Sequence, residues 1–185
     1  EETSENGYAV ANIARPSVPQ GFTDKWSFSS TVKAKDAGTI AYLKGNFRNP
    51  MNLHITRDEW KTAECLTDLN RQQHGYLWGD VQMVRWTSYD GTPLKGLLYT
   101  PESLDASRKY PMMIYFYEKN SETLYNYIQP APSRSIINIP FYVSRGYVVF
   151  VPDIVYKDGH PGESAYNCIC AGAEAMCSQF PFVDR

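Results

Sequence analysis

Two uninterrupted apolar runs, each followed by a stretch with helical periodicity, constrain the fold of this chain more than any other feature. The runs are Pro111–Tyr117 and Tyr147–Pro152, and the helical stretches are Ile136–Ser144 and Gly162–Phe180. Alternation of strand and helix is the pattern of a parallel sheet covered by helices. The first run is apolar on both faces, which predicts a strand in the middle of that sheet. We expect the sheet to continue with another strand after Arg185.

The first part of the chain has a different pattern. Short runs that alternate large and small residues occupy Trp26–Val32, Thr39–Leu43 and Met51–Ile55, with turn signals between them. Strands this short and evenly spaced predict an antiparallel meander, as in a sandwich or a propeller blade. One such meander cannot bury a core of its own size, so we expect the end piece of a larger β domain. The polar stretch Leu66–Gly75 is the predicted linker.

A new strand is predicted at Val81–Thr87, and an Asp90-Gly91 turn returns the chain into Leu94–Tyr99. We therefore divide the chain near residue 80. Residues 1–79 are predicted to form a β-rich segment, and residues 80–185 an α/β segment.

Charge and hydropathy disfavour several classes of function. The formal net charge of -2 gives no basic surface for a nucleic acid. No apolar run approaches the length of a membrane-spanning helix. Residues 1–7 are acidic and polar and do not form a signal peptide, so an exported protein would need a leader that is not in this chain. The 14 tyrosines raise the aromatic fraction to 14%, which favours a β-rich portion.

The four cysteines do not have the spacing of a metal site. Cys168 and Cys170 are too close for a CxxC motif, and no histidine pair lies nearby in the sequence. Cys170 and Cys177 are seven residues apart on one face of the predicted helix, which favours small apolar packing residues. No metal and no organic cofactor is predicted, and the redox state of these cysteines and of Cys65 stays open.

Several short segments of the second part have a distinctive order and spacing. They are Ser88-Tyr89-Asp90-Gly91-Thr92-Pro93-Leu94-Lys95-Gly96, Tyr99-Thr100-Pro101, Arg108-Lys109-Tyr110-Pro111-Met112-Met113-Ile114-Tyr115-Phe116-Tyr117, Ser144-Arg145-Gly146-Tyr147-Val148-Val149, Pro152-Asp153 and Phe182-Val183-Asp184. In this order they resemble the start of the catalytic domain of the prolyl oligopeptidase family of serine peptidases. The branch that contains dipeptidyl peptidase IV is the most similar.

The resemblance covers about residues 80–185 and implies the first half of an α/β-hydrolase domain. Thr39–Tyr42, Asn49–Leu53 and Leu66–Asn70 resemble, less specifically, the last strands of the β-propeller that such enzymes carry. The family uses a serine, an aspartate and a histidine in that order, with the serine on a strand-to-helix turn. The resemblance therefore implies that the triad lies beyond Arg185 and that the isolated chain is inactive.

No residue in the chain is a good substitute for that triad. The sequence has no Gly-x-Ser-x-Gly, and Ser164 lacks both the second glycine and a preceding strand. A residue at a helix N-terminus is the simpler interpretation of Ser164. All three histidines come before any such nucleophile, whereas the family's histidine follows it. We expect surface positions for His54 and His74, and for His160 we favour solvent exposure over a cleft-facing position.

One catalytic element of the family has a counterpart here. In the family, a tyrosine just after the first long buried strand donates a hydrogen bond to the oxyanion that forms during acyl transfer. The resemblance assigns this role to Tyr117, at the carboxyl end of its strand, and the alternative is a tyrosine that caps the sheet. Two departures alter the surrounding loops. Glu118-Lys119-Asn120 replaces Gly-Gly-Pro or Ala-Gly-Pro, and Asp153–Gly159 replaces Asp-x-Arg-Gly-Ser-Gly.

Three functions follow as hypotheses. The first is a fragment of a serine peptidase that hydrolyses peptides, with bonds after proline as one candidate preference. The second is another acyl hydrolase, such as an esterase or acylaminoacyl peptidase, and the third is a non-enzymatic binding module. A sheet ending at Arg185 would leave the Val148–Val151 strand with an open neighbour position, which predicts either a homo-oligomer or a longer parent protein. The sequence leaves the compartment of that parent unknown, and the periplasm or the cell exterior is a guess from family habit alone.

Overall fold

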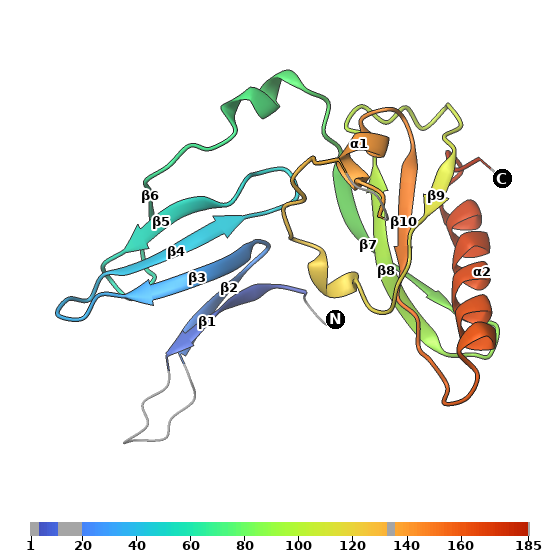
Figure 1. Cartoon of the computed structure of the whole chain (residues 1–185), viewed down its shortest axis with the longest axis horizontal. Coiled ribbons are helices and arrows are strands. Elements are labelled where there is room, and N and C mark those ends of the chain that lie inside the picture. The colour runs from blue at the N-terminus through green and yellow to red at the C-terminus, as the bar shows by residue number, and fades with distance from the viewer. Residues whose placement is uncertain (1–3, 11–19, 133–135, 185) are drawn as a thin grey trace. The chain divides into compact units, whose positions relative to one another are not determined.

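The computed structural model describes residues 4–10, 20–132 and 136–184. The chain forms two compact units (Figure 1). The first unit runs to Gln72 and also includes Tyr125–Tyr127, and the second comprises Gln73–Leu124 and the residues from Ile128 onward.

The first unit is built from antiparallel strands. Strand β1 (Asn6–Val10) pairs with β2 (Gln20–Asp24), in a region for which no strand was predicted. A four-stranded sheet has the order β3-β4-β5-β6, with bounds Ser27–Lys33, Ile40–Gly45, Asn52–Thr56 and Glu64–Cys65. Strands adjacent in sequence are adjacent in this sheet and antiparallel, so the predicted meander is confirmed. The predicted linker contains a short 3-10 helix, η1 (Arg71–Gly75).

Aromatic rings form the core of the first unit. Tyr42 on β4 is buried, and its ring centroid lies 4.9 Å from that of Trp60 and 6.1 Å from that of Phe28. Trp60 also stacks on Tyr8 of β1, at 4.7 Å and an interplanar angle of 19°. Trp60 has a φ of 74°, which is strained for a bulky residue. The ring contacts help to hold it in this conformation.

The second unit contains a mixed sheet with the order β7-β8-β10-β9. Its strands are β7 (Asp80–Thr87), β8 (Pro93–Thr100), β9 (Met112–Ile114) and β10 (Val148–Pro152). The strands β7 and β8 form the predicted hairpin, and Gly91 adopts the positive φ of 85° that its turn requires. Strand β10 pairs in antiparallel fashion with β8 and in parallel with β9. This is the predicted partial α/β sheet.

The strand order corrects two predictions. Strand β10 lies between β8 and β9, so the Val148–Val151 segment has a neighbour on each side, and all of β10 is buried. Strand β9, predicted to be central, is outside β10 and only half-buried. The apolar run does contain a strand, as predicted. Apolar composition indicates burial, however, and does not give the order of strands in a sheet. The chain leaves the regular ladder after Ile114, so β9 is also shorter than the predicted run.

Helix α1 (Ile139–Val143) is shorter than the helical stretch predicted at Ile136–Ser144. The Asn138 side chain accepts a hydrogen bond from the Phe141 amide at 3.2 Å and caps the first turn. Pro140 lies in that first turn, where no amide donor is needed. The proline therefore begins the helix and does not disturb its interior.

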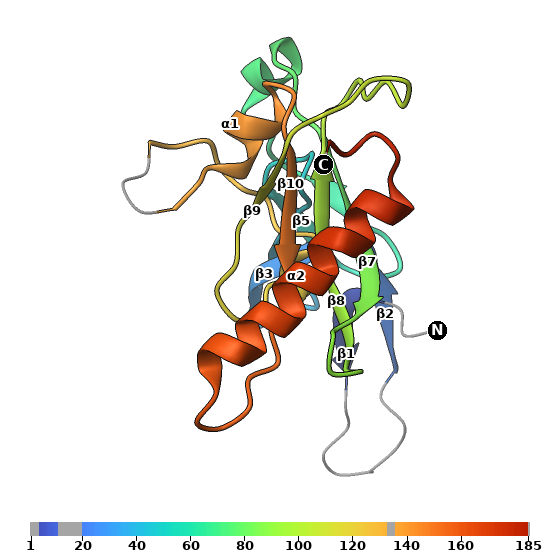
Figure 2. The same cartoon turned by 90° about the vertical axis from the view of Figure 1, so that its right-hand side faces the viewer.

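Helix α2 (Pro161–Gln179) lies across the sheet of the second unit (Figure 2). Cys168 and Met176 on the helix and Phe150 on β10 are buried in one hydrophobic core. Trp86 of β7 joins that core, with its ring centroid 5.2 Å from Phe150, and its indole nitrogen donates to the Cys168 carbonyl at 3.0 Å. A second short 3-10 helix, η2 (Ser121–Thr123), follows β9.

Near its carboxyl end the chain runs parallel to the segment that leads into β9. Val183 forms a parallel bridge with Tyr110. The Tyr110 amide donates to the Phe182 carbonyl at 2.8 Å, and the Asp184 amide donates to the Tyr110 carbonyl at 2.9 Å. Pro111 instead accepts from Val148 of β10. Because successive residues of a strand point their hydrogen-bonding groups to opposite sides, Val183 lies on the side away from β10.

Candidate active site

The candidate site lies where β9 and β10 end. Carboxyl ends of neighbouring parallel strands meet at one edge of a sheet, and this edge is where α/β proteins bind ligands. Tyr117 follows β9 by three residues, and Asp153 follows β10 directly. The loops that begin there carry both departures from the family's sequence pattern.

The Tyr117 side chain is available to a ligand. It is 78% exposed, and its hydroxyl makes no hydrogen bond to any residue in the described part of the chain. Its carbonyl accepts a hydrogen bond from the Tyr156 hydroxyl at 3.0 Å. Exposed Phe116 and Val155 lie next to these tyrosines in sequence, so apolar and phenolic groups follow both strands. This exposure disfavours the alternative in which Tyr117 caps the sheet.

Asp153 joins the two loops. It is 5% exposed, and one carboxylate oxygen accepts from the amides of Asn120 at 2.7 Å and Ser121 at 2.9 Å. The other oxygen accepts from the Ser121 hydroxyl at 2.5 Å. A buried carboxylate is tolerated when such donors replace water. The loop after β9 is thereby attached to the end of β10.

The two departures from the family's pattern contact each other. The Ile154 amide donates to the Glu118 carbonyl at 2.8 Å, beside the hydrogen bond between Tyr156 and Tyr117. The unusual residues after β9 are therefore paired with the unusual residues after β10. Hydrogen bonds thus link the loop after β9 to the loop after β10.

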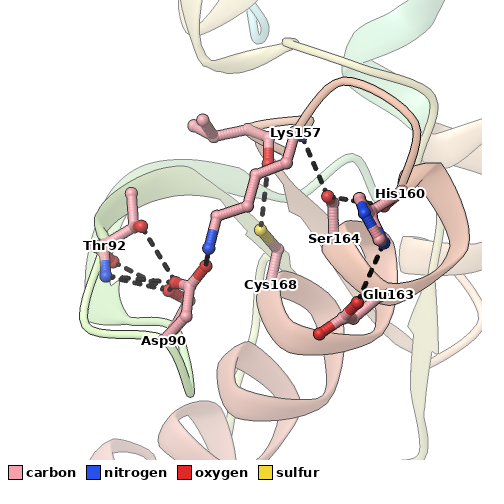
Figure 3. A network of polar contacts seen from close by, with 9 residues as sticks. Asp90, Thr92, Lys157, His160, Glu163, Ser164 and Cys168 are labelled. Carbon is pink, nitrogen blue, oxygen red and sulfur yellow. Dashed lines mark hydrogen bonds and ion pairs between the residues drawn. The ribbon is translucent and has the colours of Figure 1, made fainter.

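A second polar network links the β7–β8 turn to the loop before α2 (Figure 3). The Lys157 ammonium lies 2.6 Å from an Asp90 carboxylate oxygen. Asp90 also accepts from the Thr92 hydroxyl at 2.9 Å and from the Ser88 hydroxyl. Hydrogen bonds from Lys157, Ser88 and Thr92, in that order of effect, hold the pKa of Asp90 below its usual range. The same carboxylate raises the pKa of Lys157.

Ser164 belongs to this second network and is not an exposed nucleophile. It is buried in the first turns of α2, where its hydroxyl donates to the His160 carbonyl at 2.7 Å and accepts from the Lys157 amide at 3.0 Å (Figure 3). No serine hydroxyl is hydrogen-bonded to a histidine ring in the described ranges. The structural interpretation of Ser164 is the one that the sequence favoured.

The histidines occupy three different environments. His160 is solvent-exposed, as expected, and its ring lies 3.4 Å from the Glu163 carboxylate. His74 is exposed in η1. His54 on β5 differs from the predicted surface position because it is half-buried and stacks on Tyr42 at 5.6 Å. Burial, followed by the nearby charge of Lys44, lowers its pKa.

The cysteines are unpaired thiols. Cys168 lies in the core and Cys177 packs against it, whereas Cys170 is half-buried. Helix packing therefore involves Cys168 as well as the predicted Cys177. Among the residues that the structure describes, no cluster of three or more histidine, cysteine, aspartate or glutamate side chains could bind a metal ion. Within the same ranges, no helix is long and apolar enough to cross a membrane.

Sequence reasoning proposed Tyr117 as a site residue but did not single out the residues that contact its loop. Asp153 was noted only as part of a motif, and Ser121 and Tyr156 were not singled out. One signal was present: an aspartate directly after a fully apolar strand has to find donors if that strand end is buried. Nothing in the sequence indicated that the donors lie 32 and 33 residues earlier.

The fold has counterparts among solved structures. No protein-family model matches the sequence, and no curated protein matches it significantly. A prolyl endopeptidase structure superposes with a TM-score of 0.63 at 17% identity over 96% of this chain. The acylaminoacyl peptidase of Pyrococcus horikoshii gives a TM-score of 0.62 at 18% identity over 88% of the chain. A Bacteroides ovatus protein, provisionally assigned as a dipeptidyl aminopeptidase IV, gives 0.58 at 16% identity over 88%.

The chain spans about a quarter of each of these structures, covering 27%, 26% and 24% of their lengths. The predicted resemblance to the prolyl oligopeptidase fold is confirmed. The chain combines the strands of a propeller end with a partial α/β-hydrolase sheet.

Proposed function

We propose that this chain is part of a serine peptidase of the prolyl oligopeptidase type. In this proposal residues 1–79 are the end of its β-propeller. Residues 80–185 are the first half of its catalytic domain and stop before the nucleophile. The substrate is a peptide, and bonds after proline are a candidate site of cleavage. The remainder of the parent chain is the proposed partner of this piece.

The observation that carries the proposal is the placement of Tyr117. An exposed phenol without a hydrogen-bond partner in the described structure stands at the carboxyl edge of a partial hydrolase sheet. Acyl transfer creates a negatively charged oxygen, and a donor held ready for it stabilises the transition state. In the proposal, the Tyr117 hydroxyl donates to this oxygen. It acts with a Ser-Asp-His triad supplied by sequence beyond residue 185.

The parallel pairing of Val183 with Tyr110 supports this arrangement. A strand continuing in that direction would end at the same edge as β9 and β10. Its carboxyl end is where a nucleophile turn belongs in an α/β-hydrolase. The residue that attacks the substrate would thus lie on the edge that carries Tyr117.

The proposal is tested in the full-length parent protein with a fluorophosphonate probe and a fluorogenic X-Pro peptide. We expect labelling and turnover by the parent, and neither by the 185-residue chain alone. Replacing Tyr117 by phenylalanine should lower kcat about 100- to 1,000-fold, the usual cost of one oxyanion donor. Tyr166→Phe, which alters an exposed tyrosine on α2, is the matched control. Unchanged kcat in Tyr117→Phe would reject the oxyanion role, and turnover by the isolated chain would reject the missing triad.

Another acyl hydrolase on the same scaffold is the second candidate. The similarity to an acylaminoacyl peptidase, with nearly the same TM-score as the prolyl endopeptidase, favours keeping it. The two candidates differ in substrate: kcat/KM is compared for an X-Pro peptide, an N-acylated peptide and a simple ester. A parent protein that fails to react with the probe would instead favour a binding module, since fold alone does not fix activity.

A further inference from the structure

The position of the Tyr117 hydroxyl depends on the main chain that carries it. The ring is mostly exposed, and its hydroxyl has no partner in the described residues, so neighbouring side chains restrain it little. The paired register of β9 and β10 ends at Ile114 and Phe150, three residues before Tyr117. Whatever holds residues 115–121 therefore determines where the phenol stands.

The end of β10 supplies that restraint. Within the described ranges, residues 115–121 hydrogen-bond to other elements only through Phe150–Tyr156. On the amino-terminal side of Tyr117, the Tyr115 amide donates to the Phe150 carbonyl at 3.0 Å. At Tyr117 and beyond it the contacts come from Tyr156, Ile154 and Asp153. Ile154 contributes its main-chain amide and Tyr156 an exposed hydroxyl, so Asp153 is the one of the three that makes these contacts through a buried side chain.

Asp153 is suited to fix a loop because its carboxylate is both charged and enclosed. Its three hydrogen bonds go to two successive residues, Asn120 and Ser121, and Ser121 is itself buried. Hydrogen bonds to an ionised acceptor are about twice as strong as neutral ones. The side-chain nitrogen of Asn120 is buried without a hydrogen-bond partner, which costs free energy. The contacts to Asp153 have to offset this cost to keep the loop in this conformation.

We propose that Asp153 is a positioning residue for catalysis, one that holds the loop after β9 so that the Tyr117 hydroxyl meets the developing oxyanion. This inference rests on the proposed function of Tyr117. Asp153 does not touch the substrate in this account. It acts through the main chain of residues 118–121, and its effect belongs to the transition state and not to substrate binding.

The test uses the full-length parent protein and measures kcat and KM separately. Asp153→Ala removes all three acceptor contacts, and we expect kcat to fall about 100-fold with KM changed less than about threefold, because small misplacement of a catalytic group is costly. Asp153→Asn keeps an oxygen for both amides and should recover part of the loss, to a deficit of about 10-fold. Asp158→Asn alters an exposed aspartate of the same loop and should leave kcat unchanged.

A double-mutant cycle shows whether Asp153 acts through Tyr117. In a Tyr117→Phe background, Asp153→Asn should lower kcat less than twofold further, since the donor it positions is already gone. A full additional 10-fold loss would overturn the inference. If Tyr117→Phe lowers kcat but Asp153→Asn does not, this inference fails and the proposed function stands. If Tyr117→Phe itself has no effect, the proposed oxyanion role of Tyr117 fails and this inference fails with it.

Ser121→Ala provides the second variant if Asp153→Ala does not fold. It removes only the hydroxyl contact at 2.5 Å and leaves both amide contacts in place. We expect a smaller fall in kcat, about threefold to 10-fold, again with KM nearly constant. Wild-type kcat in a folded Ser121→Ala together with wild-type kcat in Asp153→Asn would overturn the inference.

Discussion

At position 172, helix α2 carries glycine although helix propensity alone favours alanine. A Cβ atom there would lie 2.9 Å from Cε1 and Cζ of Phe150 and 3.0 Å from Cε2 of Trp86. Phe150 is fully buried and Trp86 nearly so, and close-packed interiors leave such rings little room to move. The glycine therefore permits the close approach of the helix to the sheet.

We predict that Gly172→Ala lowers the free energy of unfolding of the second unit by about 1–3 kcal/mol, because overpacking outweighs the gain of about 1 kcal/mol in helix propensity. Urea denaturation of the two proteins measures the difference. Gly162→Ala is the matched control, since a Cβ at that position in the first turn of α2 meets no atom within 4 Å apart from its chain neighbours and the helix's own backbone. Equal stabilities of the two variants would contradict the packing argument.

The candidate site shows how far single residues can be predicted. Tyr117 could be proposed because the family resemblance ties the expected role to a position just after a recognisable strand. Asp153 could not be assigned a role in the same way, because its contacts are with Ser121. That residue is distant in the sequence and lies next to Asp153 only in the folded chain. Periodicity describes the environment along one element, whereas a hydrogen bond between two loops depends on how those elements are ordered.

Strand order is the corresponding limit for elements. The alternation in Trp26–Val32 and the turn at Asp90-Gly91 predicted local structure correctly, because both are determined by neighbours in the chain. The runs that became β9 and β10 are equally apolar, and both were correctly predicted as strands. The prediction made β9 central and left β10 with an open side, whereas β10 is central and β9 lies outside it. The connection through α1 causes this order, because it places β10 between β8 and β9. No periodicity carries that information.

The β7–β8 turn and the loop between β10 and α2 are joined by one ion pair. The Lys157 ammonium contributes this one contact, whereas the Asp90 carboxylate also accepts from Ser88 and from the hydroxyl and amide of Thr92. Removing the carboxylate therefore affects both the turn and the link. Removing the ammonium affects only the link.

We predict that Asp90→Asn lowers the thermal midpoint at pH 7 more than Lys157→Met does. The pKa of Asp90 is depressed in the folded protein, so its contribution is present above its usual value of 3.8 and is lost as the pH falls through the lowered pKa. The difference between wild type and Asp90→Asn should accordingly shrink below about pH 4. Thermal melts between pH 2 and 7 measure it, with Asp158→Asn as the control. A difference that stays constant down to pH 2 would contradict the role of the charge.

The two units bury very different amounts of apolar surface. In the described part of the first unit, the buried hydrophobic side chains are Tyr42, Phe47 and Ile55. The second unit has a contiguous core that includes all of β10 and one face of α2. A short antiparallel sheet with few buried side chains is marginal without further packing. Resistance to opening should therefore differ between the units.

We predict that amides of β4 and β5 exchange with solvent deuterium at least about tenfold faster than those of β10 in the same protein, because local opening is easiest where little apolar surface is buried. Hydrogen exchange followed by mass spectrometry resolves the strands as separate peptides. The peptides to compare are those that contain buried Tyr42 in the first unit and buried Phe150 in the second. Because both residues are buried, fraying of strand ends does not dominate the difference in exchange rate. Equal protection of the two peptides would mean that both units open in a single cooperative step. Faster exchange confined to the first unit would show that the hydrolase sheet holds its fold while the β-rich segment opens.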